Sequence, residues 1–243
     1  MTLGKHTLRS YDEQLNHLLS LTMDMGKEVQ DLIIDAKKSF REINEDKIAD
    51  AKLADKHINK LDKQIEEEAI TVLALQSPMA IDLRFVISII KITGMLEHAG
   101  DLAKNTIKRS MRIAGLVPED AIVKLEEMSD IIVEMLTGAL SAFADNDVEK
   151  SAIIWKMDKD IDAIYKSIID MMQEEMGKSA DRVMPCTQVV FAAKNLERLG
   201  DHITNLTKMV YYVMAGKRPN KATLKSIIDG VNASSDKSDN ADS

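Results

Sequence analysis

Acidic and amide side chains occur twice in this chain with one spacing, Glu-x-x-Gly-Asp-x-x-x-Asn. The first copy reads EHAGDLAKN over residues 97–105, and the second reads ERLGDHITN over residues 197–205. On an α-helix, positions i, i+4 and i+8 lie along one stripe, so each copy predicts a polar stripe on one helix face. The stripe residues are Glu97, Asp101 and Asn105 in the first copy and Glu197, Asp201 and Asn205 in the second.

A second polar pair precedes each copy. The segments LADKHINKL (53–61) and KMDKDIDAI (156–164) align as Asp-x-x-Ile-(Asn/Asp). If consecutive helices of each half pack antiparallel, the two stripes of that half converge on one polar patch. The added residues are Asp55 and Asn59 in the first half and Asp158 and Asp162 in the second.

Converging carboxylates point to cation binding. They repel each other and raise one another's pKa values unless a cation neutralises them. Oxygen ligands suit Mg²⁺, Mn²⁺ or iron, whereas a structural zinc site usually needs paired cysteines, and the chain has only Cys186. Acids spaced i, i+4 are also common on solvated helices, so the repetition of the whole pattern is what favours a cation role.

Gly100 and Gly200 occupy the same position of the two copies. Each costs about 1 kcal/mol relative to alanine inside a helix. The absence of a side chain would let another backbone or a ligand approach closely at that point.

Long helices must position these stripes. The composition is poor in aromatic residues, at 4%, and in glycine and proline, which disfavours strands. Ser77 is predicted to cap the third helix, with Pro78 at its first position, and Pro185 indicates either a late start or a kink in the sixth. The predicted helices cover residues 10–40, 46–75, 77–113 and 118–143, a fifth capped by Asp145 or Asn146 that ends near Gly177, and a sixth from about Asp181 to Gly216.

These helices and the break at residues 114–118 predict an all-α protein. We expect two tandem three-helix bundles related by pseudo-twofold symmetry, because long helices joined by short loops pack antiparallel. The first bundle would span residues 1–116 and the second residues 117–217. Residues 218–243 are rich in Ser, Asp, Asn and Lys, which predicts a disordered polar tail.

Several functional classes are disfavoured. A net charge of −8 argues against nucleic-acid binding. The most apolar stretch, residues 83–96, is too short to cross a membrane and contains Arg84 and Lys91, and no secretory signal is visible. We therefore expect a soluble, cytoplasmic protein without membrane insertion. His98 and His202 fall at different positions of the two copies, and neither completes the Glu-x-x-His pair of ferritin-like di-iron proteins. No catalytic residue is predicted.

The chain resembles the PhoU family of phosphate-uptake regulators over about residues 5–217. The resemblance is carried by the doubled acidic phrase, the Asp-x-x-Ile-(Asn/Asp) pairs, Asp82-Leu83-Arg84 and VYYVMAGK (210–217). It implies a cytoplasmic, dimeric, non-enzymatic negative regulator of phosphate-starvation signalling. Such a protein would connect a phosphate-specific ABC transporter, through its ATPase subunit, with a sensor histidine kinase.

The resemblance also implies metal clusters on the acidic faces, with iron or zinc as the metal and manganese or magnesium as further candidates. Two departures from the family pattern concern the first half. Asn59 replaces the aspartate that Asp162 retains, and His98 stands where the family has arginine, as Arg198 does here. We expect the second half to be the intact metal site. The alternatives are a metal-dependent helical-bundle enzyme, either a ferritin-like oxidase or a phosphohydrolase, and a scaffold whose acids only confer solubility.

Overall fold

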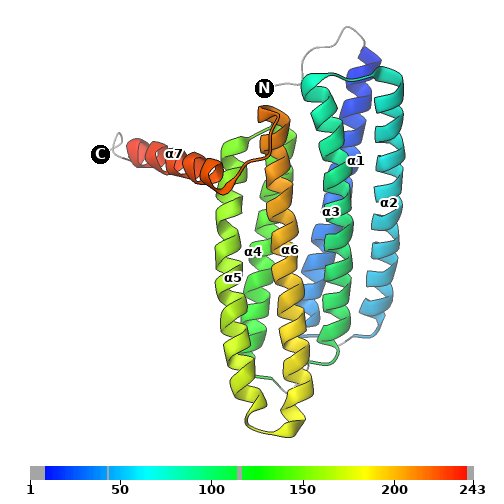
Figure 1. Cartoon of the computed structure of the whole chain (residues 1–243). Coiled ribbons are helices and arrows are strands. Elements are labelled where there is room, and N and C mark those ends of the chain that lie inside the picture. The colour runs from blue at the N-terminus through cyan, green and yellow to red at the C-terminus, as the bar shows by residue number, and fades with distance from the viewer. Residues whose placement is uncertain (1–8, 43, 114–116, 240–243) are drawn as a thin grey trace.

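The structure is a computed structural model that describes residues 9–42, 44–113 and 117–239. All regular structure in this part of the chain is helical, as predicted (Figure 1). The α-helices are α1 (Arg9–Ser39), α2 (Asp46–Gln76), α3 (Ala80–Ser110), α4 (Glu119–Asp145), α5 (Val148–Met176), α6 (Val183–Ala215) and α7 (Lys221–Asp239), with a 3₁₀ turn, η1 (Ala180–Arg182), before α6.

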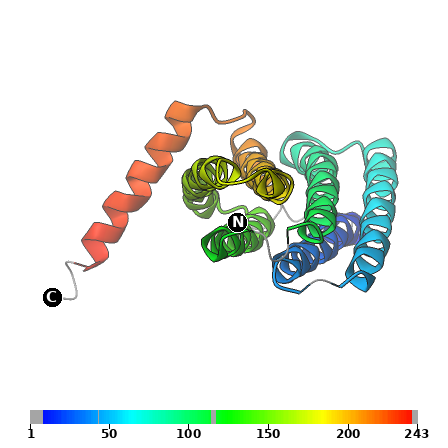
Figure 2. The ribbon, with the colours of Figure 1, turned by 90° about the horizontal axis from the view of Figure 1, so that it is seen from below.

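The first six helices form two three-helix units, α1–α3 and α4–α6, which confirms the predicted architecture. Helices α3 and α6 run antiparallel and side by side at the centre of the molecule (Figure 1). Seen along the helices, α2, α3, α6 and α5 form one layer, and α1 and α4 form the other (Figure 2). The helices that carry the four polar stripes therefore all belong to one layer.

One hydrophobic core runs through both units. Side chains from α3 and α6 contribute to it along their whole length, and α1 and α4 close it from the second layer. The rings of Phe85 in α3 and Phe143 in α4 stack with centroids 5.3 Å apart, so aromatic packing joins the two units directly. The two units therefore do not have separate interiors.

Two predicted helix caps are wrong, because each residue ends one helix instead of starting the next. Ser77 does not cap α3; it is the left-handed residue that ends α2, with φ of 46°, and Met79 precedes α3. Asn146 ends α4 in the same left-handed conformation, which asparagine tolerates well. The cap of α5 is Asp147, whose Oδ1 accepts a hydrogen bond from the backbone N–H of Lys150 at 2.9 Å.

Pro185 marks a late start rather than a kink. It is the third residue of α6, where backbone N–H groups have no partner within the helix, so the missing N–H of proline costs little. Gly216 ends α6 with φ of 72°, as expected for a glycine that follows a helix.

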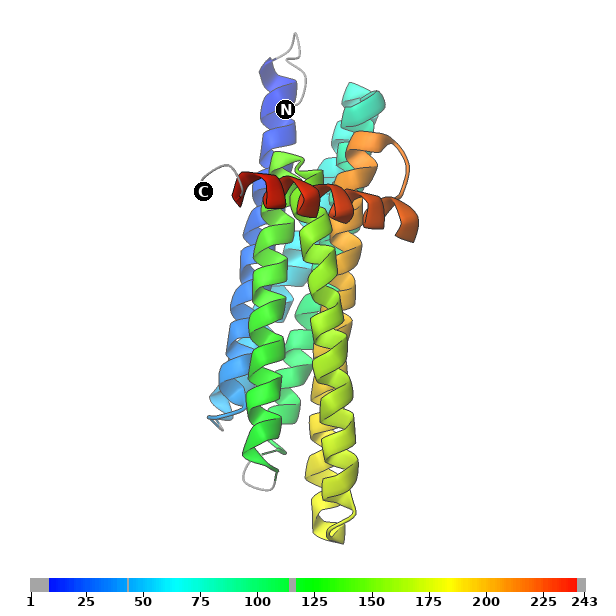
Figure 3. The ribbon, with the colours of Figure 1, turned by 90° about the vertical axis from the view of Figure 1, so that its left-hand side faces the viewer.

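Helix α7 occupies most of the segment that the sequence predicted to be a disordered polar tail. Asn220 caps it by accepting a hydrogen bond from the Thr223 N–H at 2.8 Å, and Leu224 is buried where α7 contacts α5. The composition of the last residues concealed a short apolar pattern, Leu224, Ile227, Ile228 and Val231, with helical spacing. Figure 3 shows α7 crossing the long axis of the bundle. Residues 240–243 lie outside the described part.

None of the helices in the described residues is long and apolar enough to cross a membrane.

Candidate functional site

Each half joins its two polar motifs through a glycine and an isoleucine. A Cβ atom on Gly100 in α3 would lie 3.1 Å from Cδ1 of Ile58 in α2. A Cβ atom on Gly200 in α6 would lie 2.9 Å from Cδ1 of Ile161 in α5. These isoleucines belong to the Asp-x-x-Ile-(Asn/Asp) motifs. The glycines thus allow a close helix approach, and that approach brings the polar stripes of α2 and α3, and of α5 and α6, together.

In the first half, a lysine side chain lies between the acids. Nζ of Lys104 is 2.8 Å from Oδ1 of Asp55 on α2 and 2.6 Å from Oδ1 of Asp101 on α3. The hydrogen bond from Lys104 holds the pKa of Asp101 below its usual range. An ammonium group therefore already supplies the cation that these two carboxylates need.

Glu97 lies beside this pair and is mostly buried. Its pKa is raised, first by burial and then by the negative charges of Asp101 and other nearby acids, while His98 opposes the shift. The Nδ1 atom of His98 is 3.4 Å from Oε2 of Glu97 and 2.6 Å from the Gly94 carbonyl oxygen. Glu97 thus lacks the lysine contact that Asp55 and Asp101 share.

The two asparagines of the first half, Asn59 and Asn105, make different contacts. Asn59 donates its side-chain N–H to the backbone oxygen of Asp55 at 2.9 Å, so this hydrogen bond lies within α2. Asn105 is exposed and lines a cavity with Lys108 and Arg109. The structure therefore groups Asn105 with cations.

The second half contains the same acids without a bridging lysine. Thr204 occupies the position equivalent to Lys104. The pKa of Asp158 is raised, chiefly by burial, with further contributions from the negative charges of Asp162 and Asp201, while the nearby Thr204 hydroxyl opposes the shift. This cluster therefore has no counterpart of the ammonium group that offsets part of the negative charge in the first half.

The outer residues of the second stripe each contact a lysine on their own helix. Nζ of Lys194 lies 2.6 Å from Oε2 of Glu197. Lys208 donates to Oδ1 of Asn205 at 2.9 Å. The residues left for a metal are therefore the three aspartates described above.

The donor chemistry of the second half fits a hard cation, because Asp158, Asp162 and Asp201 offer only oxygen ligands. In the first half, Lys104 competes for the same oxygens. Among residues 9–42, 44–113 and 117–239, no group of three or more His, Cys, Asp or Glu side chains is close enough to hold a metal ion. Metal binding would thus require these side chains to move.

The two motifs meet at a pair of histidines. The rings of His98 in α3 and His202 in α6 stack with centroids 5.7 Å apart and planes 18° apart. Burial, together with the positive charge of His98 and Arg198, lowers the pKa of His202. The sequence places these histidines at different positions of the two copies, and the antiparallel packing of α3 and α6 is what brings them face to face. The two acidic clusters therefore lie side by side.

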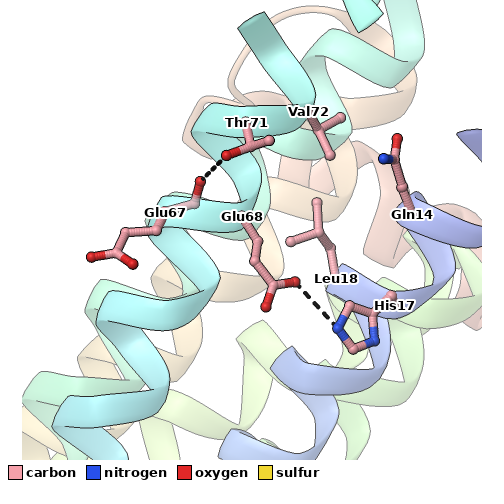
Figure 4. A pocket seen from close by; sticks show the side chains of 7 residues that line it. All are labelled: Gln14, His17, Leu18, Glu67, Glu68, Thr71 and Val72. Carbon is pink, nitrogen blue, oxygen red and sulfur yellow. Dashed lines mark hydrogen bonds and ion pairs between the residues drawn. The ribbon is translucent and has the colours of Figure 1, made fainter. Parts of the chain in front are cut away.

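A separate cavity lies between α1 and α2, away from both motifs (Figure 4). Its volume is about 310 Å³, and Nε2 of His17 lies 3.2 Å from Oε2 of Glu68 at its wall. The other lining residues are Gln14, Leu18, Glu67, Thr71 and Val72. None of the predicted site residues contributes to it.

Comparison with known proteins agrees with this duplicated arrangement. The PhoU domain model matches residues 22–110 and again residues 125–210. The chain belongs to the PhoU family. A PhoU homologue from Rhizobium meliloti, named a phosphate-specific transport system accessory protein, is 34% identical and covers 88% of this chain and 91% of its own. A homologue of the same name from Zymomonas mobilis is 32% identical, with 88% and 90% covered.

The fold agrees with solved PhoU structures. The crystal structure of PhoU from Pseudomonas aeruginosa superposes with a TM-score of 0.80 at 27% identity, covering 85% of this chain and 100% of that one. Two segments on which the resemblance to PhoU rests also meet in this structure. Nε of Arg84 in α3 donates to the backbone oxygen of Val213 near the end of α6 at 2.8 Å. This contact caps α6 and joins the two halves.

Proposed function

We propose that this PhoU protein is a cytoplasmic negative regulator of phosphate uptake and of phosphate-starvation signalling. Its relatives in Rhizobium meliloti and Zymomonas mobilis are named accessory proteins of phosphate-specific transport systems. In this proposal the protein acts without catalysis, as a homodimeric adaptor between the ATPase subunit of a phosphate ABC transporter and a sensor histidine kinase. The observation that carries the proposal is the pair of acidic clusters side by side on one layer.

The acidic layer suits a protein–protein contact. The stripes of α2, α3, α6 and α5 lie on four adjacent helices, and His98 and His202 join them at the centre. Charge on such a face sets partner choice and association rate more than affinity. We infer that basic surfaces of the transporter and the kinase dock here.

We further propose that the second half binds the metal, as iron or zinc, or else manganese or magnesium. Asp158, Asp162 and Asp201 would hold it, with Glu197 and Asn205 at the edge of the cluster. A bound cation would neutralise the acids that raise the pKa of Asp158. In the first half, Lys104 already bridges Asp55 and Asp101 and offsets part of their negative charge.

Two matched substitutions test this difference between the halves. Thr204→Lys should lower the metal retained by the protein, because it supplies an ammonium group to the second cluster. Lys104→Thr should raise the metal retained, because it frees Asp55 and Asp101. Metal content is measured by mass spectrometry after loading with iron, manganese and zinc, and circular dichroism checks that both variants fold. Equal metal content in both variants and the wild type would contradict the proposed difference.

The adaptor role is tested by co-purification from cells grown at high and low phosphate. We expect the transporter ATPase and the kinase to co-purify with the wild type and to be lost with Asp101→Ala/Asp201→Ala, because both carboxylates are solvent-accessible parts of the acidic layer. A Glu66→Ala/Glu67→Ala variant removes two exposed acids from α2 outside the motifs and serves as the control. Absence of both partners from the wild-type sample would refute the adaptor role.

A further inference from the structure

A cationic cavity lies between the end of α3 and the first half of α6. Its volume is about 200 Å³. Its lining residues are Asn105, Lys108, Arg109, Arg112 and Gln188. Three of these five side chains are positively charged, and the other two carry amides.

The three cations have no counter-charge among the residues that the structure describes. In the part of the chain that the structure describes, Lys108, Arg109 and Arg112 form no ion pair with a carboxylate. The chain has 40 acidic and 32 basic residues, so acids are available in excess. Three adjacent cations without a counter-charge repel one another, and an anion would relieve that repulsion.

Arg109 is held in place by two contacts, but its Nε has no hydrogen-bond acceptor. Its Nη1 donates to Oε1 of Gln188 at 3.2 Å, and its guanidinium carbon lies 4.6 Å from the centre of the Phe191 ring. Its Nε is buried without a hydrogen-bond partner. A buried donor without an acceptor is costly, so this side chain is positioned for a group that the protein itself does not supply.

Helix capping explains only part of this arrangement. Cations in the last turn of α3 interact favourably with the helix dipole, which accounts for Lys108 and Arg109. It does not account for Arg112, which lies beyond the helix, or for the amide contributed by α6. The positions equivalent to the three cations in the second half are Lys208, Met209 and Tyr212, so the fold does not require a cationic cluster here.

We propose that this cavity binds a small tetrahedral oxyanion of the phosphate type. Guanidinium and ammonium groups form charge-assisted hydrogen bonds with phosphate oxygens. The amide oxygens of Asn105 and Gln188 can accept a hydrogen bond from a protonated phosphate. The cavity is smaller than the roughly 300–1,000 Å³ typical of pockets for drug-sized ligands, which favours a free ion over a nucleotide. The inference does not depend on the adaptor role or on metal binding.

Calorimetric titration with inorganic phosphate tests the site in the full chain. We expect saturable binding that weakens with ionic strength, and a loss of affinity of about tenfold or more in Lys108→Gln/Arg112→Gln, because two charge-assisted hydrogen bonds are removed. Both side chains are exposed, and Arg109 keeps its contacts, so the variant should fold. Lys208→Gln makes a similar change at the position equivalent to Lys108 and should leave the affinity unchanged.

Two outcomes would overturn the proposal. One is the absence of saturable phosphate binding by the wild type, or equal binding by the wild type and the double variant. The other concerns lipid headgroups, which offer the same chemistry. If the double variant detaches from phosphatidylglycerol vesicles while free phosphate does not bind to the wild type, the oxyanion is that of a membrane lipid. Equal vesicle binding by both proteins, together with phosphate binding, supports the free anion.

Discussion

Lys104 and Thr204 occupy equivalent positions, but they give the two halves different electrostatics. Lys104 contacts an aspartate on each of two helices, whereas Thr204 leaves the acids around Asp158 without a bridging cation. The difference was visible in the phrases EHAGDLAKN and ERLGDHITN. The spacing of the motifs singled out Asn59 and His98 but not this lysine, because only the packing of α2 on α3 shows that Lys104 reaches Asp55.

The contact of Gly200 with Ile161 leads to a prediction at the residue scale. Alanine at Gly94, where a Cβ atom would meet nothing within 4 Å, should stabilise the protein by about 0.5–1 kcal/mol through helix propensity. The free energy of unfolding of Gly200→Ala should be about 1–3 kcal/mol lower than that of Gly94→Ala, because Ile161 must shift in a packed interior. Urea unfolding of the two variants measures the difference. Equal stabilisation would show that a Cβ atom at position 200 fits against Ile161 without a loss of stability.

At the element scale, the central helices and the last helix are stabilised differently. Helices α3 and α6 are buried between neighbours on several sides, so their positions are set by many contacts. Within the described part of the chain, α5 is the one long helix that α7 contacts. Isolated helices of this length are marginal in water, so packing against α5, where Leu224 is buried, stabilises α7.

Leu224→Ser should therefore release α7 without unfolding the bundle. We expect the backbone amides of α7 to exchange about tenfold faster or more, because the loss of a buried leucine costs about 2 kcal/mol or more. Hydrogen–deuterium exchange followed by mass spectrometry gives the rates for α7 and for α1–α6 in one experiment. Lys225→Ser, at the neighbouring exposed position, is the control. Unchanged exchange in α7 of the leucine variant would mean that other contacts hold it.

At the scale of the whole molecule, the duplicated units behave as one body. They share a core, the rings of Phe85 and Phe143 stack between them, and Arg84 donates to the end of α6. A polar clamp adds to these contacts. Arg41, just after α1, donates two hydrogen bonds to Glu126 in α4, at 2.8 Å to Oε1 and 2.7 Å to Oε2.

This clamp predicts a pH dependence of stability. The hydrogen bonds from Arg41 lower the pKa of Glu126 in the folded protein. Its contribution is therefore present above the unfolded glutamate pKa of about 4.3 and is lost as the pH falls through the lower folded value. Glu126→Gln should be less stable than the wild type at pH 7, and the difference should shrink below about pH 4. Urea unfolding over a pH series measures it.

Glu127→Gln is the matched control for this prediction. Glu127 is the adjacent residue, is exposed and forms no ion pair in the described residues. Its substitution should leave both the stability and the pH dependence unchanged. A constant difference between Glu126→Gln and the wild type across the series would show that the clamp does not act through ionisation.

The sequence by itself determined the six long helices, their duplication and the polar stripes on α2, α3, α5 and α6. These features depend on spacing within one helix, and the 3.6-residue period converts spacing directly into a shared face. The same reasoning failed at Ser77 and Asn146, where the conformation of a single residue decides which helix it belongs to. It also failed for α7, where four apolar residues outweigh a polar composition.

Only the tertiary structure decided which stripes are neutralised, which face each other and which residues join a different site. Lys104 reaches Asp55, His98 stacks on His202, and Arg109 meets Gln188 across helices that are far apart in the sequence. Such contacts depend on the direction and register of packing between helices. Those are set by close-packed points such as Gly200 against Ile161 and by the shared core, and no local spacing encodes them.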